Sequence, residues 1–150
     1  MTDEGGKIAR IINEAYLFKS LEEGAKEKLT DIALRRVYGK DMPLITEGEL
    51  GGDMFIIESG SVEVSATLPG GDTKLAELGA GAVLGEVAAI TDAPRTSTVV
   101  ALETVVAIVF PQDAIKGIAQ AYPKFRSLLE KMIEGRAQHT ITLIPPPSAE

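Results

Sequence analysis

The chain has 150 residues, 45% hydrophobic and 25% charged, which suits one globular domain. Its net charge is −7, and no run of Lys or Arg provides the basic surface that nucleic-acid binding needs, so we expect no direct contact with nucleic acid. The lack of Cys excludes disulfides and thiolate zinc sites. No apolar run approaches the roughly 20 residues of a membrane helix, and the acidic N-terminus does not resemble a signal peptide. We therefore predict a cytoplasmic protein without a membrane span.

The first forty residues are predicted to be helical. Apolar residues recur on one helical face at Ile8, Ile11, Ile12 and Ala15. In a second helix, Ser20 is the predicted N-cap and Glu23 takes the capping-box position. The apolar stripe continues at Leu29, Ile32 and Ala33, and Gly39 and Pro43 mark the end of the segment.

From Met42 to Phe110 the pattern predicts short strands. The stretch "DMFIIESGSVEV" gives an apolar run, a turn at Ser59-Gly60, and alternating residues after it. "LPGGD" predicts a hairpin loop, and two β-branched strands are expected on either side of a turn at Glu103. Many short strands joined by glycine-rich corners predict a sandwich or jelly roll.

Helices are expected again after Phe110. One is predicted at Gln112–Ala121, and Pro123 can open the next, which we expect to run to about Arg136. Its apolar stripe comprises Phe125, Leu128, Leu129, Met132 and Ile133. The ending "LIPPPSAE" predicts a polyproline-like tail. The predicted fold is α+β, mainly β: an antiparallel barrel or jelly roll flanked by N-terminal and C-terminal helices. We divide the chain into a domain at 1–140 and a Pro-rich tail at 141–150.

Catalytic chemistry is missing from this pattern. The one His, His139, cannot form the His cluster of a metal-dependent jelly-roll enzyme, so no metal site is predicted. There is no Cys nucleophile, and no Ser in the strand region has a His base. The acidic pair Glu22–Glu23 suits a helix start. We predict a protein that is not an enzyme and needs no cofactor.

The stretch "LGEVAAITDAPRTSTVVA" combines groups suited to a small anion. Gly85 permits an unusual backbone, and Glu86 to Ile90 can form one helical turn whose N–H groups face an anion. Arg95 after Pro94 can pair with a phosphate in two hydrogen bonds, and the hydroxyls of Thr96 and Ser97 follow it. From these residues alone, two interpretations stay open: an ion pair between Glu86 and Arg95, or two contacts with one ligand.

The same stretch resembles the phosphate-binding cassette of the cyclic-nucleotide-binding domain family, which includes the catabolite activator and the regulatory subunit of protein kinase A. Upstream, "ITEGELGGDMFIIESGSVEV" resembles the first strands of that family, with Gly48, Asp53 and Gly60 at the expected places. The resemblance covers about Phe18 to Gly135, and the chain looks like a stand-alone bacterial-type member of the family.

The resemblance implies a ligand, cAMP or cGMP, and a role for each matching residue. Arg95 would pair with the cyclic phosphate and Glu86 would accept the ribose 2′-hydroxyl. Gly85, Val87 and Ala88 would provide backbone and close contacts, and Thr96 and Ser97 would line the same pocket. Thr96 stands where cGMP-selective kinase domains of the family often carry Thr, although cAMP binders carry it too, so both bases stay open.

The family also implies a way to signal. The helix from Pro123 would move over the base or expose a surface to a protein partner or a second copy, and Arg136 is one candidate for the residue that covers the base. No helix-turn-helix, channel or kinase segment is recognised, so the chain is predicted to be a stand-alone sensor or a regulatory fragment. Two alternatives stay open: a protein-interaction scaffold that no longer binds mononucleotides, and a cyclic di-GMP receptor.

Overall fold

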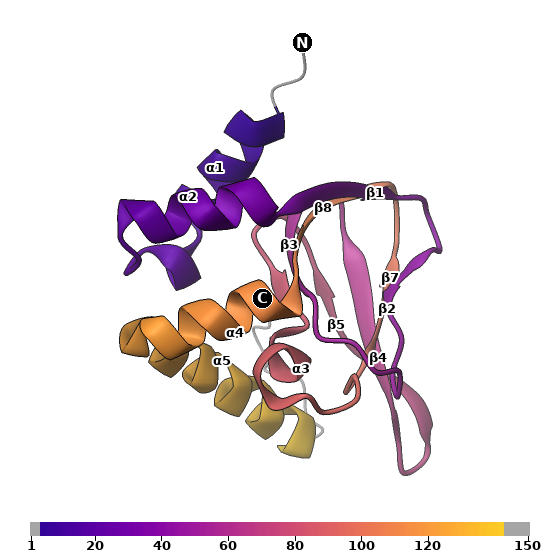
Figure 1. Ribbon diagram of the computed structural model, residues 1–150. Helices are drawn as coiled ribbons and strands as arrows, with labels where there is room; N and C mark the ends of the chain where they lie inside the picture. The colour runs from indigo at the N-terminus through magenta and orange to yellow at the C-terminus, as the bar shows by residue number, and fades with distance from the viewer. Residues whose placement is uncertain (1–3, 143–150) are drawn as a thin grey trace.

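A computed structural model describes residues 4–142 of the chain and the side chains of residues 6–134. Its strands form two antiparallel four-stranded sheets (Figure 1). The first sheet has the order β1-β8-β3-β6, with strands β1 Leu34–Tyr38, β8 Val105–Phe110, β3 Met54–Ser59 and β6 Val83–Leu84. The second has the order β2-β7-β4-β5, with strands β2 Pro43–Ile45, β7 Thr98–Ala101, β4 Val62–Leu68 and β5 Gly71–Leu78.

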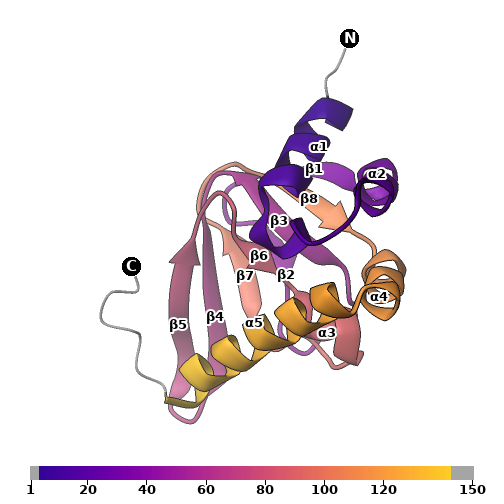
Figure 2. The same ribbon diagram turned by 90° about the vertical axis from the view of Figure 1, so that its left-hand side faces the viewer.

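The helices gather on one side of the two sheets (Figures 1 and 2). Those before the sheets are α1 Glu4–Glu14, the short 3₁₀ helix η1 Tyr16–Phe18 and α2 Glu23–Ile32. Helix α3, Glu86–Thr91, interrupts the strand region between β6 and β7. Helices α4 Gln112–Ala121 and α5 Pro123–Thr142 follow the last strand.

The first sheet separates two apolar cores. Along β3, Met54 and Ile56 belong to a core that the helices cover, whereas Phe55 and Ile57 belong to a core between the two sheets. Strand β8 divides its residues in the same alternating way. Successive side chains of a strand point to opposite faces. The continuous apolar runs of β3 and β8 are therefore explained by burial on both faces.

Three phenylalanines join the N-terminal helices, the sheet and the C-terminal helices. The ring centroid of Phe18 lies 5.3 Å from that of Phe110 at the end of β8. It lies 5.7 Å from the ring centroid of Phe125 in α5. All three side chains have no exposed surface. Burial of such rings is among the largest single contributions to a core. Helix α5 is therefore anchored through its first turn.

The predicted fold class is confirmed: an antiparallel jelly roll with helices at both ends. The turn at Ser59-Gly60 lies between β3 and β4, and "LPGGD" closes the β4–β5 hairpin, where Leu68 pairs with Gly71. The helix predicted at Gln112–Ala121 has these bounds, and the next helix opens at Pro123.

The expectation that the first forty residues are all helical is wrong. Helix α2 ends at Ile32, and Leu34–Tyr38 forms β1, which pairs with β8. The pairing of Leu34 with Val109 and Tyr38 with Val105 satisfies the backbone there, and no local periodicity reveals a partner so distant in the chain. Ile32, which we placed in the apolar stripe, is 46% exposed.

The predicted capping box at Ser20 is also wrong. Helix α2 begins at Glu23, and its N-cap is Glu22, which makes no side-chain cap hydrogen bond. The first helical hydrogen bond runs from Lys26 N to Glu22 O. Leu21 is buried, and its N–H donates to Phe18 O, so η1 and its turn take up the chain around Ser20 before α2 begins. The acidic pair Glu22–Glu23 does lie at the helix start, as expected.

Helix α5 continues to Thr142, beyond the expected end near Arg136, and it includes the first two residues of the predicted tail. Phe125 and Leu129 of its predicted stripe are buried, and Leu128 and Met132 pack against the helix-covered core. The stretch "LIPPPSAE" and the side chains of Arg136 and His139 lie outside the described residues.

A bidentate ion pair joins two strands of the first sheet. Arg35 on β1 donates from Nε and Nη2 to the two carboxylate oxygens of Glu58 on β3, each at 2.8 Å. Both side chains are 19% exposed. The hydrogen bond from Arg35 is the main reason why the pKa of Glu58 is lowered from 4.5, and burial opposes it. The charges of Lys7 and Arg10 on α1 lower it further.

Because its pKa is lowered on folding, Glu58 stabilises the fold above pH 4.5 and loses that contribution as the pH falls through the lowered value. We expect Glu58→Gln to lower the free energy of unfolding near neutral pH by about 1–2 kcal/mol, because a charge-assisted pair becomes a neutral one. Urea unfolding at several pH values measures this. The difference from the unmodified chain should shrink below pH 4.5. The exposed Glu27→Gln on α2 is the control, and a difference independent of pH would contradict the prediction.

Candidate ligand-binding site

The turn at Gly85 opens the short helix α3, as the sequence predicts. Gly85 is the N-cap, with the left-handed backbone φ 80° and ψ 13°. The first helical hydrogen bond is donated by Ala89 N to Gly85 O. The N–H groups of Glu86, Val87 and Ala88 therefore precede the helical bonding pattern, and such groups are available to a negatively charged ligand.

Gly85 is required for space as well as for its backbone angle. A Cβ at this position would lie 2.7 Å from Asp53 O and 2.8 Å from Nη1 of Arg95. Heavy atoms of side chains do not approach so closely, and a left-handed backbone is unfavourable for residues with a Cβ. The glycine therefore allows the Arg95 side chain to lie against the chain at the start of α3.

The guanidinium of Arg95 is held by main-chain oxygens from two other segments. Its Nη2 donates to Asp53 O at 2.9 Å, and its Nη1 lies 3.5 Å from Gly85 O. It also lies over the ring of Phe55, 5.9 Å from the centroid. Burial lowers the pKa of Arg95, and the charges of Asp53, Glu49 and Glu86 oppose that effect. An arginine stays charged at neutral pH under such influences, so the site holds a partly desolvated cation.

Glu86, the first residue of α3, is 2% exposed and is the buried charged side chain of the described core. Its charge acts on Arg95 after those of Asp53 and Glu49. A carboxylate rarely lies so deep unless it has a role or a compensating contact. The structure thus brings a buried acid and a half-buried base together at the start of α3.

The remaining predicted site residues differ in exposure. Ala88 is buried, Gly85, Val87 and Ser97 are partly buried, and Thr96 is exposed. The loop that ends in Arg95 pairs with an earlier loop: Arg95 N donates to Glu49 O, and Gly48 N donates to Arg95 O. These two bonds fix the main chain of Arg95 on both sides of its Cα.

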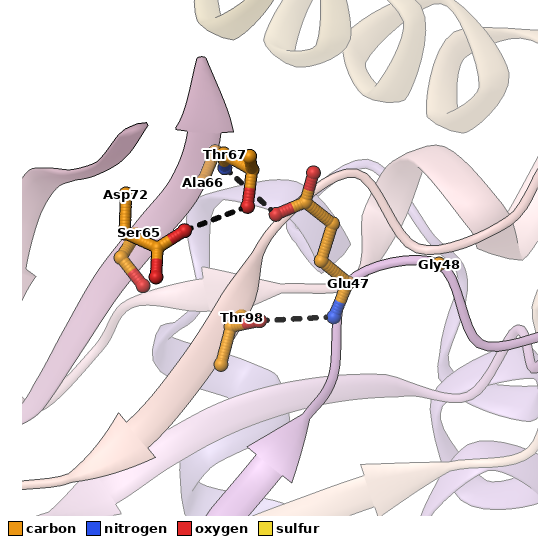
Figure 3. A pocket seen from close by; sticks show the side chains of 7 residues that line it. All are labelled: Glu47, Gly48, Ser65, Ala66, Thr67, Asp72 and Thr98. Atoms are coloured by element: carbon orange, nitrogen blue, oxygen red, sulfur yellow. Dashed lines mark hydrogen bonds between the residues drawn. The ribbon is translucent and has the colours of Figure 1, made fainter. Parts of the chain in front are cut away.

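A polar pocket of about 470 Å³ lies beside that earlier loop (Figure 3). It is lined by Glu47, Gly48, Ser65, Ala66, Thr67, Asp72 and Thr98. Glu47 N donates to Thr98 Oγ1, and the Glu47 carboxylate accepts the N–H of Thr67 on β4. Thr67 Oγ1 donates to Asp72. These polar groups largely pair with one another. We therefore interpret their hydrogen bonds as an anchor for the loop of Glu47 and Gly48, whose main chain pairs with that of Arg95.

Sequence reasoning assigned no role to three residues that shape the site. Asp53 provides the main-chain oxygen for Arg95, and its carboxylate accepts the N–H of Gln112 at 3.2 Å. Phe55 provides the ring beneath the guanidinium. Gln112 contacts α3 through its side chain. Asp53 was singled out only as part of the resemblance, and no local pattern marks the other two.

Within residues 4–142, no helix is long and apolar enough to cross a membrane. The same part of the chain shows no group of three or more His, Cys, Asp or Glu side chains placed to hold a metal ion.

Residues 35–122, more than half of the chain, match the protein family described as "Cyclic nucleotide-binding domain". The chain belongs to the cyclic nucleotide-binding domain family. The match begins in β1 and ends just after α4, so it includes both sheets, α3 and Arg95. The resemblance on which the site residues were predicted is thereby confirmed at the level of the family.

Curated relatives of this domain include regulatory subunits of kinases. The cAMP-dependent protein kinase regulatory subunit of Debaryomyces hansenii is 38% identical over 95 residues, 63% of this chain and 20% of that protein. The acetyltransferase Pat of Mycolicibacterium smegmatis is 36% identical over 102 residues, 68% of this chain and 30% of that protein. The chain spans about a fifth of the length of the first kinase relatives, so similar domains occur within larger proteins, one of them an enzyme.

Solved structures share the fold. The regulatory domain of Toxoplasma gondii PKA with cAMP has a TM-score of 0.76 and 28% identity, over 85% of this chain and 50% of that chain. A cyclic nucleotide-binding domain from Methylobacillus flagellatus has a TM-score of 0.73 and 26% identity, over 93% of this chain and 82% of that chain.

We expect Gly85→Ala to destabilise the domain by more than the roughly 1–2 kcal/mol of a left-handed backbone strain, because its Cβ would also displace Asp53 O or Arg95. Urea unfolding measures the change. Gly81→Ala is the matched control, since Gly81 has φ 91° but no atom within 4 Å of its added Cβ. Equal losses in the two variants would show that the close approach at Gly85 has no energetic weight.

Proposed function

We propose that this domain binds cAMP or cGMP, with Arg95 on the cyclic phosphate and Glu86 on the ribose. The observation that carries the proposal is the arrangement of the Arg95 guanidinium. It has five N–H donors, and two of its N–H groups face main-chain carbonyls. Within the described part of the chain, the other donors make no hydrogen bond and can meet a phosphate. A guanidinium already oriented by fixed oxygens loses little freedom when the anion arrives.

The start of α3 provides the second contact to the phosphate in this proposal. The N–H groups of Val87 and Ala88 lie before the helical bonding pattern, and the left-handed Gly85 lets the chain approach the ligand closely. Two N–H groups and one guanidinium together complement an anion of a single negative charge.

Glu86 is proposed to accept the 2′-hydroxyl of the ribose. Its burial suits this role, because a carboxylate in a site of low polarity gains most from a hydroxyl donor. A deoxyribose lacks that donor and would leave the acid without its ligand contact. Glu86 would therefore select a ribonucleotide over a deoxyribonucleotide.

Thr96 and Ser97 are proposed to line the pocket beyond the phosphate. Thr96 is exposed, so its hydroxyl is accessible to the amino group of a guanine base, and Ser97 is half-buried. This arrangement accommodates cGMP without excluding cAMP, because the exposed Thr96 hydroxyl can hydrogen-bond to water when no guanine amino group is present.

The output is proposed to be non-enzymatic. Nucleotide binding would reposition α5, whose position then favours or disfavours contact with a protein partner or a second copy of the chain. A ligand shifts such an equilibrium only through its different affinity for the two positions. Three further features stay predictions: a stand-alone bacterial-type organisation, a cytoplasmic location and a domain division at residue 140. The two alternatives, a scaffold and a cyclic di-GMP receptor, also stay open.

Ligand identity is tested by the melting temperature of the chain with cAMP, cGMP and cyclic di-GMP. A ligand that binds only the native state raises the melting temperature with its concentration. We expect an increase with cAMP, cGMP or both. An increase with cyclic di-GMP alone would support the dinucleotide receptor, and no change with either mononucleotide at millimolar concentration would support the scaffold.

The role of Arg95 is tested by calorimetry on Arg95→Ala. We expect an affinity loss of about 10-fold to 100-fold or more, because a charge-assisted bond to phosphate contributes about 1.5–3 kcal/mol. Arg95→Lys keeps the charge but loses the planar guanidinium, so its affinity should lie between that of the unmodified chain and that of Arg95→Ala. Glu86→Ala should cost less than Arg95→Ala, since the proposed partner of Glu86 is neutral.

The exposed Arg36→Ala on β1 is the control for the loss of one positive charge. Circular dichroism should show that all variants keep the fold. Glu86→Ala should also reduce the preference for cAMP over its 2′-deoxy form. Unchanged affinity in Arg95→Ala would refute the assignment of the site.

A further inference from the structure

The side chain of Gln112 joins α3 to the first turn of α4. Its Nε2 donates to Ala88 O in α3 at 3.0 Å and to Oδ1 of Asp92 at 2.8 Å. Asp92 is the C-cap of α3 and has a left-handed backbone with φ 61°. One amide group from α4 thus contacts both the middle and the end of the short helix that follows Gly85.

A glycine on a third segment makes room for this side chain. A Cβ added to Gly52 would lie 2.2 Å from Cδ of Gln112, 2.4 Å from Nε2 and 2.5 Å from Oε1. The backbone of Gly52 is outside the left-handed region, so space alone restricts this position. The bare glycine and the amide of Gln112 therefore fit each other.

A second residue of α4 contacts the same end of α3. Lys116, one helical turn after Gln112, places Nζ 2.6 Å from the same Oδ1 of Asp92. Asp92 thus receives two donors from one face of α4, and α3 is held at its C-terminal end.

The main chain of Gln112 reaches the other side of the site. Its N–H donates to Oδ1 of Asp53, the residue whose carbonyl accepts Nη2 of Arg95. Gln112 therefore contacts α3 directly through its side chain. Its main chain binds Asp53, which in turn binds the guanidinium of Arg95, so Gln112 is linked to Arg95 through Asp53.

Helix α4 can transmit a displacement because its far face is packed. Ile115, Ile118 and Ala119 are buried in the helix-covered core, together with Phe125 and Leu129 of α5. Packed interfaces move as units more readily than they deform. A shift of α3 that pulls on Gln112 would therefore move α4 and the start of α5.

We propose that Gln112 is a positioning residue that couples nucleotide binding at α3 to α4 and α5, an inference that rests on the proposed function. The amide holds α3 in the geometry that meets the phosphate, and it carries a ligand-induced shift of α3 into the C-terminal helices. The separate possibility that Gln112 only stabilises the fold predicts the same loss of stability but no loss of coupling.

The test compares amide hydrogen exchange in α4 and α5 of the full chain, with and without saturating cAMP or cGMP. Two variants remove the donated hydrogen bonds: Gln112→Ala, and the nearly isosteric Gln112→Glu, which keeps the volume but cannot donate from this position. Gln120→Ala and Gln120→Glu make the same changes at an exposed position of the same helix. Calorimetry on each variant confirms that the nucleotide is bound.

We expect the Gln112 variants to bind nucleotide about 5-fold more weakly, at the lower end of typical coupling between sites. At saturation, their ligand-dependent change in exchange across α4 and α5 should be lost, whereas the Gln120 variants should keep it. A full ligand-dependent change in both Gln112 variants would overturn the inference and leave the proposed function standing. No binding to the unmodified chain would overturn the proposed function, and the coupling with it.

A double-mutant comparison tests the contact itself without any nucleotide. Gly52→Ala should displace the Gln112 side chain and increase exchange in α3, and we expect the same effect from Gln112→Ala. Because both changes break one contact, the double variant should lose no more protection in α3 than the larger single loss. Additive losses would show that Gly52 and Gln112 act independently, and would overturn the role assigned to this contact.

Discussion

The partly desolvated guanidinium of Arg95 is the constraint on which the rest of the site depends. A cation removed from water must be compensated nearby, and here main-chain carbonyls of Asp53 and Gly85 provide the compensation. Main-chain oxygens cannot be lost by substitution and move only when their segments move. The position of Arg95 therefore depends on the residue before β3 and on the start of α3. A phosphate bound to Arg95 would be affected by a movement of either segment.

The layered fold explains how the segments that hold Arg95 keep their positions. Strands β3 and β8 lie between two cores, so each of their buried residues is packed against either the helices or the second sheet. Met54 and Phe55 follow Asp53 directly and are buried on opposite faces. The carbonyl that holds Arg95 is thus fixed by both cores, which a strand with one solvent-exposed face could not achieve.

Helix α3 is the least self-sufficient element of the site. It has six residues, too few to be stable in isolation. Its geometry must come from contacts with neighbouring elements, and Gln112 and Lys116 of α4 provide them at its C-terminal end. An element that depends on its neighbours also affects them when it moves, so a short helix beside the proposed ligand suits the regulatory role proposed for it.

The sequence alone determined most of the strand region, the bounds of α4, the start of α5 and the helical turn after Gly85, because each has a local periodicity or turn residue. The assignment of Gly85 to Ser97 to a ligand site rests on the family resemblance and stays a prediction. The sequence pattern misplaced Ser20 as a helix cap and missed β1, whose partner Val105–Phe110 lies far along the chain. It also assigned no role to Gln112 or Phe55. Arg95 meets Asp53 across 42 residues, and Gln112 meets Asp53 across 59. Local pattern reports which face of an element is apolar. Only the tertiary structure decides which distant oxygen or glycine a polar side chain meets, because chain folding sets that proximity and neighbouring residues do not.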